Sequence, residues 1–154
     1  MNVAERAAKK EVMGDTLRRK PVLLVESDFQ HTVTISRIFR ELHLLDDLAI
    51  CVDCENALMR LNQVGGERPA LVLLDLKMPR MSALSFLRLL KEDANLQTIP
   101  VVILADSNQD DEVSACYNLG AAGYLVKSGD YSELRAKLNG VCEYWTLSRL
   151  PKTC

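Results

Sequence analysis

The chain has 154 residues, 48% of them hydrophobic, and a formal net charge of −2 at pH 7. This length suits one domain with a sizeable buried core, and the small net charge gives no indication of nucleic acid as a partner. No segment approaches the roughly 20 consecutive apolar residues of a membrane helix, and none resembles a signal peptide. We interpret the five cysteines as reduced thiols, so we expect a cytoplasmic protein without membrane contact.

Residues 1–19 are predicted to form a basic tail, and residues 20–154 a single domain. Residues 1–20 carry six Lys and Arg against three Asp and Glu, a formal charge of +3 that leaves −5 for the remainder. Residues 3–13 contain good helix formers but are short for an isolated helix. We therefore expect a solvated, partly disordered tail.

Apolar runs and helical patterns alternate along the rest of the chain. Strands are predicted near residues 22–25, 48–52, 71–74, 99–104 and 123–126. Helices are predicted from about 31 to 43, around 57–61 with Gly65-Gly66 as its end, from about 82, from about 110 to Gly120, and over 134–145. The alternation predicts an α/β fold, a doubly wound five-stranded parallel sheet with helices on both faces.

Charged residues follow three of these strands. Asp75 comes directly after the apolar run 71–74, where it is as readily a loop or capping aspartate as a functional one. Glu26 follows the first strand and Lys127 the last. Because parallel strands bring their carboxyl ends to one edge, two carboxylates and an ammonium are expected there, a suitable site for Mg²⁺ and a phosphoryl group.

Several sequence motifs carry a family resemblance. They are VLLVE at 22–26, LVLLDLKMP at 71–79, IPVVIL at 99–104, GAAGYLVK at 120–127 and the aromatic pair at 144–145. The chain resembles the response-regulator receiver domain of two-component signalling from about Lys20 to its end. It is most similar to single-domain regulators paired with bacterial phytochromes. The resemblance implies a flavodoxin-like strand order of 2-1-3-4-5 and a phosphoacceptor signalling domain rather than an enzyme.

The resemblance also implies roles for individual residues. Asp75 would be the phosphoacceptor and Lys127 the phosphate-contacting lysine. Glu26 and the backbone carbonyl of Lys77 would join Asp75 in holding Mg²⁺. Tyr124 would be the aromatic switch residue.

Three positions depart from the family pattern. Ser27 replaces the second acid that ligates the metal, and a hydroxyl is a much weaker Mg²⁺ ligand, so weak metal binding is expected. Asp28 is an alternative ligand, although helix capping suits it better. Ala105, the second switch position, replaces a Thr or Ser that would contact the phosphoryl group. Ser128 replaces a proline preceded by a cis peptide, so a trans bond is expected there.

These observations predict a stand-alone receiver in a phosphorelay. Asp75 would accept a phosphoryl group from a histidine kinase or phosphotransfer protein, slowly because of Ser27 and Ala105. The last two strand–helix units would offer a face for a homodimer. The alternative is a pseudo-receiver, a protein-binding module that acts without phosphorylation. An enzyme on this topology is disfavoured, because a flavodoxin needs a phosphate loop where this chain has Glu26, and an aspartate phosphatase needs an acid where it has Lys77.

Other residues have simpler interpretations. Cys51 and Cys54 have CxxC spacing, but no second pair completes a zinc site, so packing roles are expected. His31 and His43 invite a metal or phosphohistidine interpretation. They lie near opposite ends of one predicted helix without a suitably spaced second ligand, so exposed or helix-end positions are favoured. Trp145 is expected to pack on the domain. Three neighbouring residues off that helix face suit a partner contact, namely Tyr144, Leu147 and Leu150.

Overall fold

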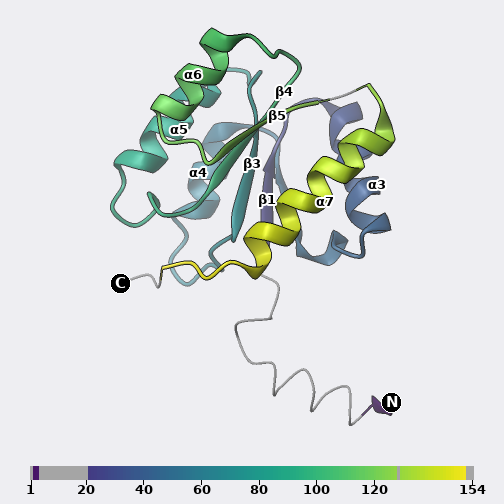
Figure 1. The fold of residues 1–154 in the computed structure, drawn as a ribbon. Helices are drawn as coiled ribbons and strands as arrows, with labels where there is room; N and C mark the ends of the chain where they lie inside the picture. The colour runs from purple at the N-terminus through teal and green to yellow at the C-terminus, as the bar shows by residue number, and fades with distance from the viewer. Residues whose placement is uncertain (1, 4–20, 128, 152–154) are drawn as a thin grey trace.

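A computed structural model of the chain describes residues 2–3, 21–127 and 129–151, and the expectations for the basic tail and for Ser128 lie outside them. The described chain forms a five-stranded parallel sheet with the order β2-β1-β3-β4-β5 (Figure 1). The predicted fold and strand order are confirmed. The strands are β1 (Val22–Val25), β2 (Leu48–Cys51), β3 (Leu71–Asp75), β4 (Val101–Ala105) and β5 (Gly123–Val126).

Helices cover both faces of the sheet, as Figure 1 shows. One face carries α3 (Phe29–Glu41) and α7 (Tyr131–Leu147). The other carries α4 (Cys54–Leu61), α5 (Ala83–Glu92) and α6 (Asp110–Asn118). A short 3₁₀ helix, η1 (Leu45–Asp47), precedes β2. No helix among the described residues has the length and apolar character required to span a bilayer.

The core has two layers because the central strands are buried on both faces. Side chains alternate along β1, so Leu24 faces the α3 and α7 layer while Val25 faces the other. Phe39 of α3 and Phe86 of α5 are fully buried in the two layers. Trp145 packs against the edge of the first layer, as expected.

The predicted end of α4 was wrong. The helix ends at Leu61, and Asn62 caps it through its backbone N–H. The following residues form turns, with the Gly66 N–H donating to the Gln63 carbonyl. Gly65 serves these turns rather than the helix end, because its φ of 76° lies in the left-handed region that glycine adopts without strain.

The CxxC pair lies at the junction of β2 and α4. Cys51 and Cys54 are free thiols and buried. Burial raises the pKa of Cys54 to about 12 and also raises the pKa of Cys51. These thiols are therefore protonated at neutral pH and poor nucleophiles, in agreement with a packing role.

Asp53 links two loops at the carboxyl edge of the sheet. Its buried carboxylate caps α4 by accepting the Asn56 N–H at 2.7 Å, and it also accepts the Asn56 side-chain amide at 3.0 Å. The same carboxylate pairs with the Arg80 guanidinium in the loop between β3 and α5. Next to it, the Glu55 carboxylate accepts the Met81 N–H at 3.2 Å. The loop that follows Asp75 is thus fixed against the start of α4.

We predict that Asp53→Ala lowers the free energy of unfolding by about 1–2 kcal/mol, because the α4 cap and the loop contact are lost together. Urea denaturation measures the change. Asp53→Asn is the matched control and should lose less, since its amide oxygen can still accept the Asn56 N–H. Equal stability of Asp53→Ala and the wild type would contradict this account of the loop.

Candidate functional site

Three strand ends deliver the charged residues expected at the carboxyl edge of the sheet. Glu26 follows β1, Asp75 ends β3, and Lys127 follows β5. Backbone hydrogen bonds continue the sheet to this point, from the Glu26 N–H to the Cys51 carbonyl at 3.0 Å and from the Lys127 N–H to the Ala105 carbonyl at 2.6 Å. The residues are distant in sequence but share one edge because the strands are parallel and in register.

The Lys127 ammonium lies between the two carboxylates. Its Nζ is 3.2 Å from Asp75 Oδ2 and 3.4 Å from Glu26 Oε1. All three side chains are nearly buried, with exposures of 6% or less. Buried charges are costly unless paired, and the ammonium compensates the two acids.

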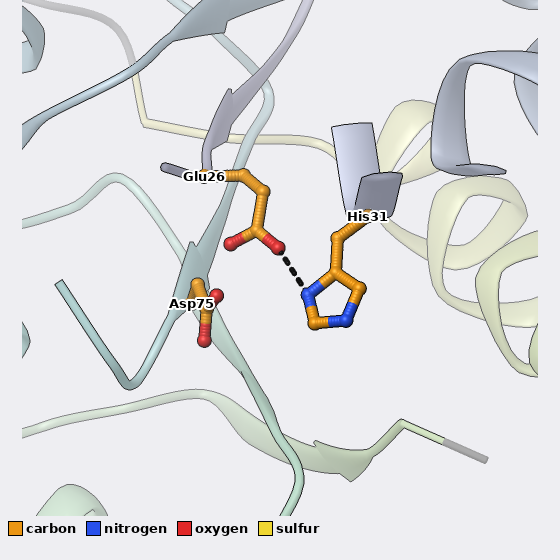
Figure 2. A group of neighbouring side chains, drawn as sticks. All are labelled: Glu26, His31 and Asp75. Carbon is orange, nitrogen blue, oxygen red and sulfur yellow. Dashed lines mark hydrogen bonds and ion pairs between the residues drawn. The ribbon is translucent and has the colours of Figure 1, made fainter. Parts of the chain in front are cut away.

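His31 also belongs to this cluster, which the sequence analysis missed. Its Nδ1 lies 2.7 Å from Glu26 Oε1, the contact drawn as a dashed line in Figure 2, and 2.9 Å from Lys127 Nζ. The residue lies in the first turn of α3, immediately after the β1 loop. The signal in the sequence was the separation of five residues between His31 and Glu26. Across a strand–loop–helix junction, this spacing brings the two side chains into contact. The favoured helix-end position is correct for His31, but the fold brings its ring to Glu26 and Asp75, although no suitably spaced partner was expected from the sequence.

The surroundings of Glu26 disfavour the charged form of its carboxyl. Burial, and next the neighbouring Asp75 carboxylate, raise the pKa of Glu26 well above the ordinary value, while Lys127 acts in the opposite direction. Glu26 Oε2 is buried and has no hydrogen-bond partner. An acceptor left unpaired in this way beside a second carboxylate is what a divalent cation would satisfy.

The backbone beside Asp75 fixes its carboxylate. The Lys77 N–H donates to Asp75 Oδ1 at 3.1 Å, so the loop turns back over the acid. The Lys77 side chain extends outward, is largely exposed, and lies 3.9 Å from Asp106 Oδ2. Asp106, half-exposed at 46%, is therefore paired on the outside of the site.

Asp28 caps α3, as favoured from the sequence. Its Oδ1 accepts the His31 N–H at 3.0 Å, and this bond is the main cause of its lowered pKa. Ser27 is exposed next to it. Among the described residues, the group whose ligand atoms lie within 4.8 Å of one another consists of Glu26, His31 and Asp75, so Asp28 is not brought into it.

The two expected switch positions lie on the neighbouring strands. Ala105 is 1% exposed at the end of β4 and brings no hydroxyl to the edge. Tyr124 of β5 is half-buried, and its hydroxyl donates to the Ser107 carbonyl at 2.7 Å. Burial raises the pKa of Tyr124, so the phenol remains a donor at neutral pH. This bond ties β5 to the loop that follows β4.

Comparisons with known proteins agree with this geometry. A family model described as the response regulator receiver domain matches residues 22–139. The probable methanogenesis regulatory protein FilR2 of Methanothrix harundinacea is 33% identical over 138 residues, which cover 86% of this chain and 89% of that protein. The response regulator Rcp1 of Synechocystis is 32% identical over 130 residues, which cover 82% of this chain and 88% of that protein.

Solved structures have the same fold. The phosphorylated cyanobacterial phytochrome response regulator RcpA matches with a TM-score of 0.78 and 29% identity, covering 87% of this chain and 99% of that chain. The Mn²⁺-bound form of Rcp1 matches with a TM-score of 0.73 and 30% identity, covering 86% of this chain and 99% of that chain.

We predict that Lys127→Met lowers the free energy of unfolding by about 3 kcal/mol at pH 8, because two buried carboxyls lose their compensating charge. The loss should be smaller at pH 5. A carboxyl whose folded-state pKa is raised, as that of Glu26 is, keeps its proton longer in the folded protein, so stability falls as pH rises. Removal of the ammonium strengthens this trend.

Denaturant titrations at the two pH values test the prediction. Lys77→Met is the matched control, because this exposed lysine makes only a long surface ion pair, and its effect should stay within about 0.5 kcal/mol. A Lys127→Met variant as stable as the control at pH 8 would contradict the role of the ammonium.

Proposed function

Because the chain belongs to the response-regulator receiver family of two-component signalling, we propose that Asp75 accepts a phosphoryl group from a phosphohistidine of a histidine kinase or phosphotransfer protein. The observation that carries the proposal is the Asp75 carboxylate itself. It is buried at the end of β3, held by the Lys77 N–H, and contacted at 3.2 Å by the Lys127 ammonium. This is the chemistry that phosphoryl transfer to an acid requires.

The residues of the chain supply positioning and charge compensation. One Asp75 oxygen forms a bond to phosphorus while the bond from phosphorus to the donor nitrogen breaks. The bonding pair returns to that nitrogen, and the donor ring, with a proton on its other nitrogen, leaves as neutral histidine. The Lys127 ammonium lies within reach of the same carboxylate, so it can contact oxygens of the transferred group. The Lys77 N–H restrains the orientation of the carboxylate during the approach.

A divalent cation fits the acidic side of this site. Glu26 and Asp75 would hold Mg²⁺, together with the backbone carbonyl of Lys77, and the unpaired Glu26 Oε2 supports this assignment. The cation supplies neutralisation of charge on the phosphoryl oxygens and on the acids around them. Receiver proteins use divalent ions, and Rcp1 has been solved in a Mn²⁺-bound form.

We expect phosphorylation to be slow. Ser27 offers a hydroxyl where a second carboxylate would bind the cation more strongly, and Ala105 offers no hydrogen bond to the phosphoryl group. Asp106 would repel a phosphoryl group if its carboxylate pointed into the site. This repulsion is limited, because the carboxylate is paired with Lys77 outside the cluster. The proposed acceptor Asp75 is retained, but the coupling between a phosphoryl group on it and the rest of the domain is weakened.

The face formed by α6, β5 and α7 is the expected output surface. Tyr124 is tied to the Ser107 carbonyl on this side of the domain. Tyr117 of α6 and Tyr144 and Leu147 of α7 are exposed large hydrophobic residues. We predict a homodimer or a partner contact through these units. We also predict that the chain acts as a stand-alone regulator.

The second candidate is a pseudo-receiver that binds a partner without phosphorylation. Ser27 and Ala105 favour it, because they weaken the metal site and remove a contact to the phosphoryl group. The retained acceptor and lysine oppose it. The following experiment separates the two candidates.

We predict that the full chain, incubated with a small acyl phosphate and Mg²⁺, gains the mass of one phosphoryl group at Asp75. The buried carboxylate next to Lys127 is the reacting group. Intact-mass measurement detects the adduct, and the Asp75→Asn variant should show none. Asp106→Asn is the matched control, because this acid lies outside the cluster, and it should retain the adduct. A folded wild-type protein without adduct would favour the pseudo-receiver.

We further predict that Ser27→Asp combined with Ala105→Thr increases the initial rate of phosphorylation by about tenfold or more. The acid adds an oxygen ligand for Mg²⁺, and the hydroxyl adds a donor to the phosphoryl oxygens. The rate is followed by intact mass at fixed donor concentration, with the single variants as controls. No increase in the double variant would mean that these two departures do not limit the reaction.

A further inference from the structure

The arrangement around Glu26 contains a nitrogen ligand that the receiver resemblance does not provide. We infer that His31 Nδ1 is the third protein ligand of the cation site, beside Glu26 and Asp75, and that the site binds first-row transition ions such as Mn²⁺ in preference to Mg²⁺. The inference deepens the proposed function, because it concerns the metal of the same site. It does not depend on whether Asp75 is phosphorylated.

The geometry of the three side chains supports it. Their ligand atoms all lie within 4.8 Å of one another, and Figure 2 shows them converging from β1, α3 and β3. Two ligands about 2.1 Å from one ion are separated by roughly 3 Å when adjacent and about 4.2 Å when opposite. The observed cluster is thus close to the size of a metal site, and binding of an ion requires the Lys127 ammonium, which contacts the same three side chains, to shift.

His31 is positioned by its own helix. Asp28 accepts the His31 backbone N–H at 3.0 Å and so fixes the first turn of α3 at the mouth of the site. The ring presents Nδ1 to the cluster, 2.7 Å from Glu26 Oε1. In the tautomer with its proton on Nε2, the ring accepts from Lys127 Nζ at 2.9 Å, and Nδ1 then presents a lone pair to the cluster.

A second, independent observation points to a ligand. Glu26 is 1% exposed, yet its Oε2 is buried without a hydrogen-bond partner. At the other oxygen, the Lys127 ammonium occupies the place that a metal cation would take, 3.4 Å from Oε1. A bound ion would satisfy Oε2 and leave Lys127 available for an anion at Asp75.

The donor set decides the kind of ion. Mg²⁺ strongly prefers oxygen ligands and near-ideal octahedral geometry, and Ser27 does not supply the missing carboxylate. An imidazole nitrogen with two carboxylates suits Mn²⁺, Fe²⁺, Co²⁺ or Zn²⁺, whose affinities for nitrogen are higher. His31 therefore replaces the ligand that Ser27 does not supply. Because the new ligand is a nitrogen, the preference of the site changes from Mg²⁺ to transition ions.

The test uses the full chain with Mn²⁺ as the probe. Pulsed electron paramagnetic resonance detects ¹⁴N coupling when a histidine ligates Mn²⁺, and titrations with Mn²⁺ and with Mg²⁺ give the selectivity. We expect ¹⁴N coupling in the wild type and a Kd for Mn²⁺ about tenfold or more below that for Mg²⁺. In His31→Ala the coupling should vanish, and Mn²⁺ affinity should fall about tenfold.

Two further variants sharpen the assignment. The chain has two histidines, so His43→Asn is the matched control, and asparagine tolerates the left-handed backbone at this position, where φ is 59°. This variant should keep the coupling and the affinity. His31→Asp exchanges nitrogen for oxygen, so it should lose the coupling and shift the selectivity toward Mg²⁺.

Each outcome bears on the inference. Absence of ¹⁴N coupling in the wild type, or its persistence in His31→Ala, overturns it. Preserved selectivity in His31→Asp also overturns it. The phosphorylation assay is read separately. An Asp75 adduct without ¹⁴N coupling refutes the metal inference alone, and ¹⁴N coupling without an adduct refutes the phosphoacceptor proposal alone.

Discussion

The Lys127 ammonium between two buried acids is the interaction on which the carboxyl edge of this domain depends. Glu26 and Asp75 are buried beside each other, and burial together with the Asp75 carboxylate raises the pKa of Glu26, which Lys127 opposes. The lysine reaches both because β5 ends level with β1 and β3 in a parallel sheet, although 101 residues separate Lys127 from Glu26. The strand order therefore decides the electrostatics of the site.

The same contact joins distant parts of the sheet. Lys127 connects the end of the edge strand β5 to the ends of β1 and β3, so under the proposed function a metal ion or phosphoryl group at the acids would act on a contact that holds β5. Tyr124, on the same strand, is bonded to the loop after β4. By contrast, the loop after Asp75 is fixed against the start of α4 through Asp53 and Arg80, so the proposed acceptor lies on a rigid support.

Much of the fold could be predicted from sequence, and the exceptions have physical causes. The apolar runs of β1 and β3 are continuous because these strands are buried on both faces, which made them recognisable without alignment. Asp28 was recognised as a helix cap, and it accepts the His31 backbone N–H at the start of α3. The end of α4 was misplaced, because Gly65 was assigned to a helix end when it serves a later turn.

The sequence by itself determined the sheet, its two covered faces, and the gathering of Glu26, Asp75 and Lys127 at one edge. The strands and helices follow from the local periodicity of apolar residues. The gathering of the three charged residues follows from the rule that parallel strands bring their carboxyl ends to one edge of the sheet. Only the tertiary structure decided that His31 joins the cluster and that Asp106 turns away to Lys77. The direction of a side chain at a loop–helix junction depends on how the loop closes and which charges surround it, and a linear pattern does not record this.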